Sequence, residues 1–135
     1  MIVVTSAPVD VAAHEAAVAD PRAGAVVSFA GVVRDHDHGR TVVALEYEGH
    51  PTAEAVLREV VAEIAKEPSV YRIAVSHRIG PLAIGDVALA AAVSTAHRAE
   101  AFELCARLVD EVKARLPIWK HQIFADGTDE WVNCP

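Results

Sequence analysis

The fold is organised around residues 94–122, which read STAHRAEAFELCARLVDEVKARLPIWKHQ. Apolar residues recur in this stretch at steps of three and four, as on one face of an α-helix. The residues of this face are Ala101, Cys105, Leu108, Val112 and Leu116. We expect a single long helix that packs on a core, with Ser94 or Thr95 as its N-cap. Pro117 should end it, because the residue before a proline avoids the helical region.

Basic residues lie at both ends of this helix. His97 and Arg98 fall in the first turn, where a cation costs about 0.3–1 kcal/mol unless an anion binds to the free N–H groups. Lys113 lies in the last turn, about 22 Å along the axis from Arg98. Taken singly, each is more typical of a solvated surface charge than of a binding site. If they cooperate, the ligand is long or a second copy of the chain completes the site, which favours a homodimer.

Lys113 and Lys120 flank the proline stop. The chain can fold back there and bring the two ammonium groups close together. Two close lysines repel, which lowers the pKa of at least one and gives an amine nucleophile or base near neutral pH.

The composition is that of a globular protein. Its 135 residues are 53% hydrophobic and 23% charged, which suits one domain (1–135) with a real core. The net charge of -7 argues against a nucleic-acid partner. Cys105 is expected to be a small core residue, and with Cys134 it makes neither a disulfide framework nor a zinc site. We see no leader peptide and no membrane span, so we expect a cytoplasmic protein.

The remaining pattern predicts an α+β fold with a mixed or antiparallel sheet and about three helices. Strands are expected at residues 2–5, 25–33, 41–48, 71–78, 87–93, 120–124 and 131–132. Shorter helices are expected at 11–19 and from Pro51 to about 65, the latter with Ala55, Val56, Leu57, Val60 and Ile64 inside. We expect the strands at 25–33 and 41–48 to form a hairpin across a polar loop, and Gly31 to mark a bulge or a close backbone approach.

Three other site chemistries were considered. His36 and His38 in Asp35-His36-Asp37-His38 could bind a metal in a hydrolase, if His50 or His77 supplied a third ligand. A serine or cysteine nucleophile is disfavoured, since no G-x-S-x-G motif is present and Cys105 is expected to be buried. A non-catalytic module that binds a phosphorylated small molecule would keep Arg34, His97 and Arg98 but would not need both lysines.

Several short motifs occur in a familiar order. They are Phe29-Ala-Gly-Val-Val-Arg34, Leu45-Glu-Tyr-Glu48, His77-Arg-Ile-Gly80, Ile84-Gly-Asp86, Val93-Ser-Thr-Ala-His-Arg98 and Pro117-Ile-Trp-Lys120, followed by Asp126-Gly127 and Trp131-Val132. In these motifs, from about residue 25 to 132, the chain resembles the large, catalytic subunit of molybdopterin synthase. The resemblance implies an α/β-hammerhead-like fold.

The resemblance also implies a function. Members of that family are sulfurtransferases that convert cyclic pyranopterin monophosphate into the dithiolene molybdopterin, in molybdenum cofactor biosynthesis. Their sulfur comes from a small ubiquitin-like subunit with a C-terminal thiocarboxylate. They assemble as a homodimer within a heterotetramer, and the resemblance implies no metal, no further cofactor, no nucleic acid and no membrane.

The family's site residues carry over by position. The implied catalytic pair is Lys113 and Lys120. The implied substrate-binding residues are Val32, Val33, Arg34, His97, Arg98, Lys113, Lys120, His121 and Gln122. Gln122 departs from the acidic residue often found there, so no carboxylate is expected from that position.

Overall fold

The computed structural model describes residues 1–133. Its elements, in chain order, are β1 (Ile2–Thr5), α1 (Val11–Ala17), β2 (Ala25–Val32), β3 (His36–Asp37), β4 (Arg40–Gly49), α2 (Ala53–Ile64), β5 (Val70–Arg78), β6 (Gly80–Leu82), β7 (Val87–Thr95), α3 (Arg98–Arg115), β8 (Ile118–Phe124) and β9 (Asp129–Val132). The predicted α+β class and, within the described residues, its three helices are confirmed.

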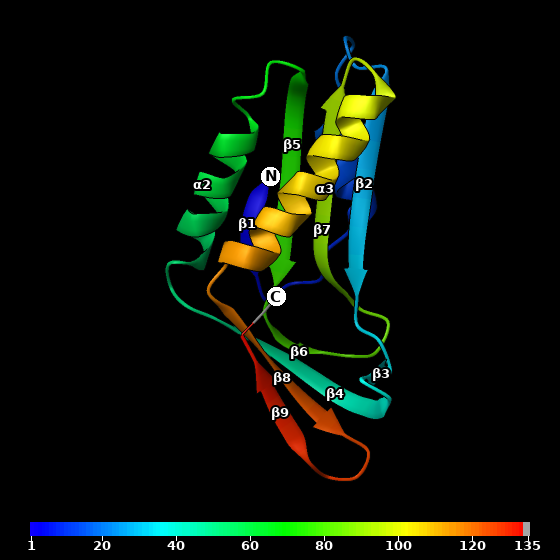
Figure 1. The fold of residues 1–135 in the computed structure, drawn as a ribbon, viewed down its shortest axis with the longest axis vertical. Coiled ribbons are helices and arrows are strands. Elements are labelled where there is room, and N and C mark those ends of the chain that lie inside the picture. Colours follow the sequence, from blue (N-terminus) through cyan, green and yellow to red (C-terminus); the bar gives the residue numbers. More distant parts are fainter. Residues whose placement is uncertain (134–135) are drawn as a thin grey trace.

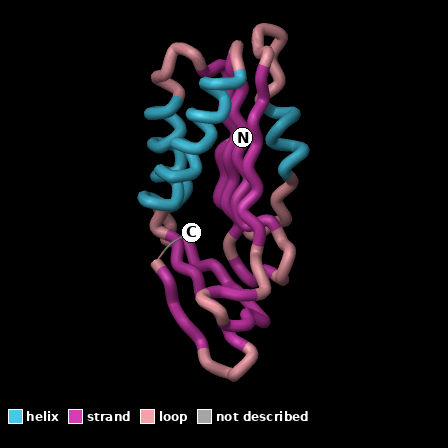
Figure 2. Tube along the Cα trace, turned by 45° about the vertical axis from the view of Figure 1, so that its right-hand side comes forward, coloured by secondary structure: helices cyan, strands magenta, loops and turns pink. Residues whose placement is uncertain are grey.

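The larger sheet has the strand order β1-β5-β7-β2. β1 runs parallel to β5, and the other pairs are antiparallel. Helices α2 and α3 cover one face of this sheet and α1 covers the other (Figures 1 and 2). The central strand β7 is therefore buried on both faces, which explains its nearly continuous apolar sequence.

The second sheet lies at one end of the larger one (Figure 1). Its strand order is β3-β4-β8-β9, and β6 also pairs with β4. One face of β4 and β8 is buried and the other is more open to solvent, so their side chains alternate in burial.

The expected hairpin between residues 25–33 and 41–48 is wrong. β2 pairs with β7, and β4 pairs with β8 in the other sheet. Val27 and Phe29, on one face of β2, pack against the core of the larger sheet, which places β2 beside β7 rather than beside β4. The bulge at Gly31 is confirmed, because the register of β2 on β7 shifts between Gly31 and Val32.

The polar loop at residues 34–40 also contains structure that the sequence pattern did not indicate. His36 pairs with Thr41 and Asp37 with Arg40, so β3 and β4 form a tight hairpin. Its two central residues, His38 and Gly39, have φ values of 50° and 75°. Positive φ at both positions is the geometry of a two-residue hairpin turn that matches the twist of the strands.

Helix α3 has the predicted buried face and the predicted end. Ala101, Cys105, Leu108 and Val112 are all buried, and so is Leu116 just beyond the helix. Leu116 has extended backbone angles, as expected before Pro117.

The predicted N-cap of α3 is wrong. Ser94 and Thr95 are fully buried at the end of β7, and His97 is the N-cap. The Thr95 hydroxyl instead donates to the backbone oxygen of His97 (2.6 Å). Pairing with β2 and β5 keeps both residues in the strand and shifts the helix start to Arg98.

Helix α2 starts and faces the core slightly differently from the prediction. Leu57, Val60 and Ile64 are buried as expected, but Ala55 is exposed and Ala53 takes its place. Ala53 lies one turn before Leu57, whereas Ala55 lies on the opposite side of the helix. Helix α1 begins after Asp10, whose side chain accepts from the Ala12 N–H, and ends at Ala17 rather than 19.

Cys105 is buried and free, as predicted, and Cys134 lies outside the described residues. None of the helices in residues 1–133 is long and apolar enough to span a lipid bilayer.

Candidate active site

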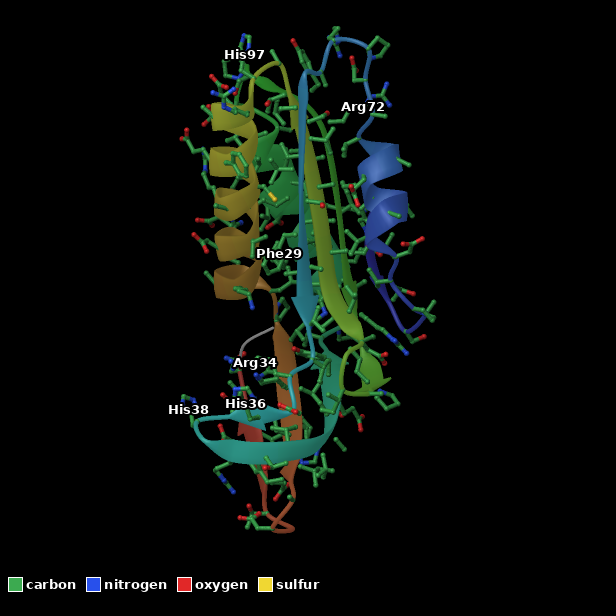
Figure 3. All side chains as sticks on the ribbon, turned by 90° about the vertical axis from the view of Figure 1, so that its right-hand side faces the viewer. Phe29, Arg34, His36, His38, Arg72 and His97 are labelled. Carbon is green, nitrogen blue, oxygen red and sulfur yellow. The ribbon has the colours of Figure 1, made fainter. Side chains whose placement is uncertain are left out.

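The basic residues at the two ends of α3 lie far apart in one chain. Arg98 is the first residue of the helix and Lys113 lies in its last turn, about 22 Å away along the axis. Figure 3 shows His97 at one end of the molecule and Arg34 near the other, beside the hairpin that carries His36 and His38. A single chain therefore does not bring His97 and Arg98 to Arg34.

A small cavity lies where β2 leaves the larger sheet and meets the second one. Its volume is about 60 Å³. Five of the predicted residues line it, namely Val32, Val33, Arg34, Lys120 and Gln122. Asp37 and Tyr47 line it as well, although the sequence pattern did not assign them to this site.

Backbone hydrogen bonds hold the segment that brings Arg34 to the cavity. After the bulge in β2, the Val33 N–H donates to the Asp86 oxygen (2.9 Å), and the Val33 oxygen accepts from the Gly85 N–H (2.8 Å). The segment then enters the β3–β4 hairpin. Arg34 is thus held from both sides while most of its side chain stays exposed.

Alternation along β8 divides the residues after Pro117 between two faces. Lys120 and Gln122 line the cavity, and Lys120 is directly opposite Tyr47 of β4. His121 points to the other face, where its ring stacks on Trp131 (4.3 Å between centroids) and its Nε2 lies 2.7 Å from Asp129 Oδ2. The structure therefore brings Lys120 and Gln122 together and separates His121 from them.

Asp37 is the carboxylate of this cavity. Its Oδ2 accepts from Gln122 Nε2 (2.8 Å), and its Oδ1 lies 3.6 Å from the Arg34 guanidinium. The hydrogen bond from Gln122, aided by the positive charges of His38, Lys120 and Arg34, holds the pKa of the Asp37 carboxyl below its usual range, although burial opposes them. A carboxylate is thus present after all, supplied by β3 rather than by residue 122.

Lys113 is linked to the cavity through His77 and Tyr47. The buried ring of His77 packs edge-on against Tyr47, with centroids 4.9 Å apart. Burial lowers the pKa of His77 to about 4, and the positive charge of Lys113 contributes in the same direction. Tyr47 and Lys120 both line the cavity, so the charge of Lys113 acts on a histidine that packs against the cavity wall.

A second, more open cavity lies at the start of α3. Its volume is about 500 Å³, and it is lined by Gly24, Ala96, His97, Arg98 and Ala99. The N-cap residue His97 makes no side-chain bond to the helix, so the first N–H groups can meet a ligand. A helix start with adjacent basic side chains suits an anion such as a phosphate.

The metal-hydrolase alternative finds no third ligand in the part of the chain that the structure describes. No group of three His, Cys, Asp or Glu side chains in residues 1–133 is gathered for a metal ion. His50 lies 2.8 Å from the Thr52 hydroxyl, and the Nδ1–H of the buried His77 donates to the Arg78 oxygen (2.8 Å).

Three residues at the site were missed by the sequence reasoning. Tyr47 and His77 lay within the quoted motifs and at alternating strand positions, which is the signal that could have found them. Asp37 entered only as a member of the Asp35-His36-Asp37-His38 cluster, because its position depends on the β3–β4 hairpin, which the sequence pattern did not indicate.

A family model described as "MoaE protein" matches residues 4–115 of the chain. Among similar proteins, the molybdopterin synthase catalytic subunit of Arabidopsis thaliana is 38% identical over 120 residues, 88% of this chain and 61% of its own length. That of Nostoc sp. is 37% identical over 132 residues, 96% of this chain and 80% of its own length. The chain thus spans about three fifths of the Arabidopsis protein.

Solved structures show the same fold. Molybdopterin synthase from Staphylococcus aureus matches with a TM-score of 0.87 and 34% identity, over 96% of this chain and 94% of that one. A Burkholderia ambifaria protein described as molybdopterin biosynthesis MoaE protein matches with a TM-score of 0.81 and 32% identity, over 98% and 88%.

Proposed function

Because the chain belongs to the MoaE protein family, we propose that it is a molybdopterin synthase catalytic subunit, a sulfurtransferase of molybdenum cofactor biosynthesis. Its substrate is cyclic pyranopterin monophosphate, and its product is the molybdopterin dithiolene. The sulfur donor is the C-terminal thiocarboxylate of a separate, small ubiquitin-like subunit. The relatives are described as catalytic subunits, which supports the presence of a second kind of subunit in the enzyme. The expected location is the cytoplasm. The pterin is the substrate and not a cofactor, and the reaction as proposed uses no resident metal or cofactor.

The observation that carries this proposal is the cavity lined by Arg34 and Lys120. His77, on which the charge of Lys113 acts, packs against Tyr47 in the wall of this cavity. In sulfur transfer the thiocarboxylate sulfur forms a bond to a pterin carbon, the bond from sulfur to the glycyl carbonyl carbon breaks, and water completes the glycyl carboxylate. A protein group can assist by attacking or polarising that carbonyl carbon, and water then hydrolyses any acyl bond so formed. Lys113 is our candidate for this covalent step, and an amine can serve as such a nucleophile. Lys120 acts as a general acid or base, or as a charge partner of the substrate.

The substrate phosphate needs the cationic helix start, which lies too far from this cavity in one chain. We propose that His97 and Arg98 reach the cavity from a second copy. The shared site requires the two copies to run in opposite directions, so that the start of α3 in one meets Arg34 of the other.

Edge strand β2 offers the surface for such a dimer. At the other edge, side chains of α2 cover β1: the Val4 N–H donates to Glu54 (3.0 Å), and Arg58 donates to the Ile2 oxygen (3.2 Å). β2 ends the sheet order, and beside it runs an apolar groove of about 420 Å³ between its own residues and α3. Phe102 at this groove is 63% exposed.

The length of β2 matches the distance along α3 that separates the helix start from Lys113. Its eight residues span about 25 Å at 3.3 Å each, close to the 22 Å between Arg98 and Lys113. Ala25 pairs with Thr95 near the start of α3, and Val32 leads to Arg34. Antiparallel pairing of two β2 strands about a two-fold axis would therefore place His97 and Arg98 of one copy beside Arg34 of the other.

Reconstitution tests the activity. The chain, a thiocarboxylated small subunit and cyclic pyranopterin monophosphate should together yield the dithiolene product, and the chain alone should yield none. Lys113→Ala and Lys120→Ala should each slow product formation by at least about a hundredfold, as removal of a catalytic acid, base or nucleophile does.

Lys66→Ala, at an exposed lysine beyond the end of α2, is the matched control and should keep the parent rate. Near-normal turnover in both active-site variants would refute their roles. Absence of product from the parent chain with a competent donor would refute the proposed activity itself.

A further inference from the structure

Asp37 is an unexpected residue for a site that binds an anionic substrate. Its side chain is only 15% exposed, and it lies between the Arg34 guanidinium (3.6 Å) and the His38 ring (3.7 Å). The positive charge of Lys120 also acts on it. A carboxylate here opposes a phosphate that approaches the same cations, so its presence calls for a physical reason.

The reason lies in the charges of the site before substrate binds. Arg34 and Lys120 line the same cavity of only about 60 Å³, so their positive charges repel if no anion lies between them. Without a counter-ion their long side chains would turn outwards to water. The buried amide of Gln122 holds Asp37 in place by donating to one carboxylate oxygen, and the other oxygen faces Arg34.

We propose that Asp37, oriented by Gln122, is a positioning residue: an internal counter-ion that holds Arg34 and Lys120 together until the anionic substrate arrives. This inference rests on the proposed function, since the substrate it prepares for is the pterin phosphate. The substrate anion competes with Asp37 for the same cations. Loss of the carboxylate therefore has two effects of opposite sign, weaker catalysis and tighter binding of a simple anion.

Asp37→Asn is the first test, on the complex of the chain with its thiocarboxylated partner. We expect kcat to fall at least about tenfold, the usual loss when a hydrogen bond to a charged group is removed. Inorganic phosphate, titrated calorimetrically into the chain without its partner, should bind about threefold more tightly, as expected for removal of one partly exposed competing charge. A merely structural role of Asp37 would weaken both properties together.

A charge swap gives a sharper test. In the double variant Asp37→Asn/Gln122→Glu, the amide lies on β3 and the carboxylate on β8, so the same hydrogen bond is restored with its ends exchanged. We expect kcat and phosphate affinity to return to within about threefold of the parent, since swapped partners keep their coupling. Asp35→Asn is the matched control, because Asp35 is 74% exposed and does not itself line the cavity, although it pairs with His36, which does.

The outcomes separate cleanly. Parent-like kcat in Asp37→Asn, a fall in both properties, or no recovery in a folded double variant would each overturn the counter-ion role. If the parent makes no dithiolene product, but phosphate affinity still rises in Asp37→Asn and returns in the double variant, the proposed function fails while the counter-ion role stands.

Discussion

His77, in β5, is fully buried, and its ring packs against Tyr47 at the candidate site. Its Nδ1–H donates to the Arg78 oxygen, and within the described residues its Nε2 has no hydrogen-bond partner. Burial, with a contribution from Lys113, lowers its pKa to about 4. The folded protein thus holds a neutral histidine that the unfolded chain would protonate at an ordinary pH.

We predict a pH-dependent loss of stability from this residue. Between about pH 6.5 and pH 4 the unfolded chain binds a proton at His77 and the folded protein does not, so stability falls as the pH falls. A difference of about 2.5 pKa units corresponds to about 3 kcal/mol at the low end. Above pH 6.5 both states are neutral and the effect vanishes.

Urea unfolding of the parent and His77→Phe at a series of pH values measures this effect. The variant keeps a ring against Tyr47 but cannot titrate, so its stability should fall less between pH 6.5 and 4. His50→Phe, at an exposed histidine, should keep the slope of the parent. Identical slopes in parent and His77→Phe would contradict the prediction.

At the scale of elements, the corner between β7 and α3 determines where the cationic helix start lies. β7 keeps Ser94 and Thr95 in the sheet, and the chain turns at Ala96 and His97 before the helix begins. Gly24, just before β2, packs against this corner. A Cβ at Gly24 would lie 2.5 Å from the backbone oxygen of Ala96, too close for any atom pair of this kind.

We predict that Gly24→Ala destabilises the protein by about 1–3 kcal/mol, the usual cost of overpacking, because a backbone oxygen cannot move aside. Gly31→Ala is the matched control. There a Cβ would meet a Phe29 ring atom at 3.3 Å, which can shift by a few tenths of an ångström, and the Leu89 Cβ at 3.4 Å, an ordinary van der Waals contact. Urea unfolding of both variants should place Gly24→Ala clearly lower, and equal midpoints would contradict the explanation.

At the scale of the whole molecule, one chain carries two groups of candidate site residues that lie far apart. The cavity with Arg34 and Lys120 lies beside the second sheet, and the helix start with His97 and Arg98 lies at the far end (Figure 3). An antiparallel dimer through β2 would bring these two groups together from neighbouring copies. Light scattering should therefore give the mass of a dimer at micromolar concentration.

Mixing two inactive variants tests the shared site directly. In a dimer of Lys120→Ala with Arg98→Ala, one site combines both defects and the other has neither. After subunit exchange, half of the dimers are mixed and half of their sites are intact, so about a quarter of the parent activity should return.

The control mixture pairs Lys120→Ala with Lys113→Ala. Both lysines belong to the same half of the site, so neither site of the mixed dimer is intact and no activity should return. No recovery in the test mixture despite verified exchange would show that Arg98 does not act across the two-fold axis. Recovery in the control mixture would show that Lys113 and Lys120 of one site come from different copies.

The local sequence by itself determined the elements of this protein. The spacing of apolar residues from Ala101 to Leu116, the stop at Pro117 and the bulge at Gly31 follow from side-chain periodicity and backbone sterics, which act within a few residues. The α+β class and the motifs that indicate the family could be read from the same information.

The tertiary structure decided which elements meet. Contacts between distant segments determine three features: the pairing of β2 with β7 rather than with residues 41–48, the hydrogen bond from Gln122 to Asp37, and the burial of His77 against Tyr47. Such contacts are chosen by the burial of whole sheet and helix faces, a property of the assembled fold that no short stretch of sequence contains.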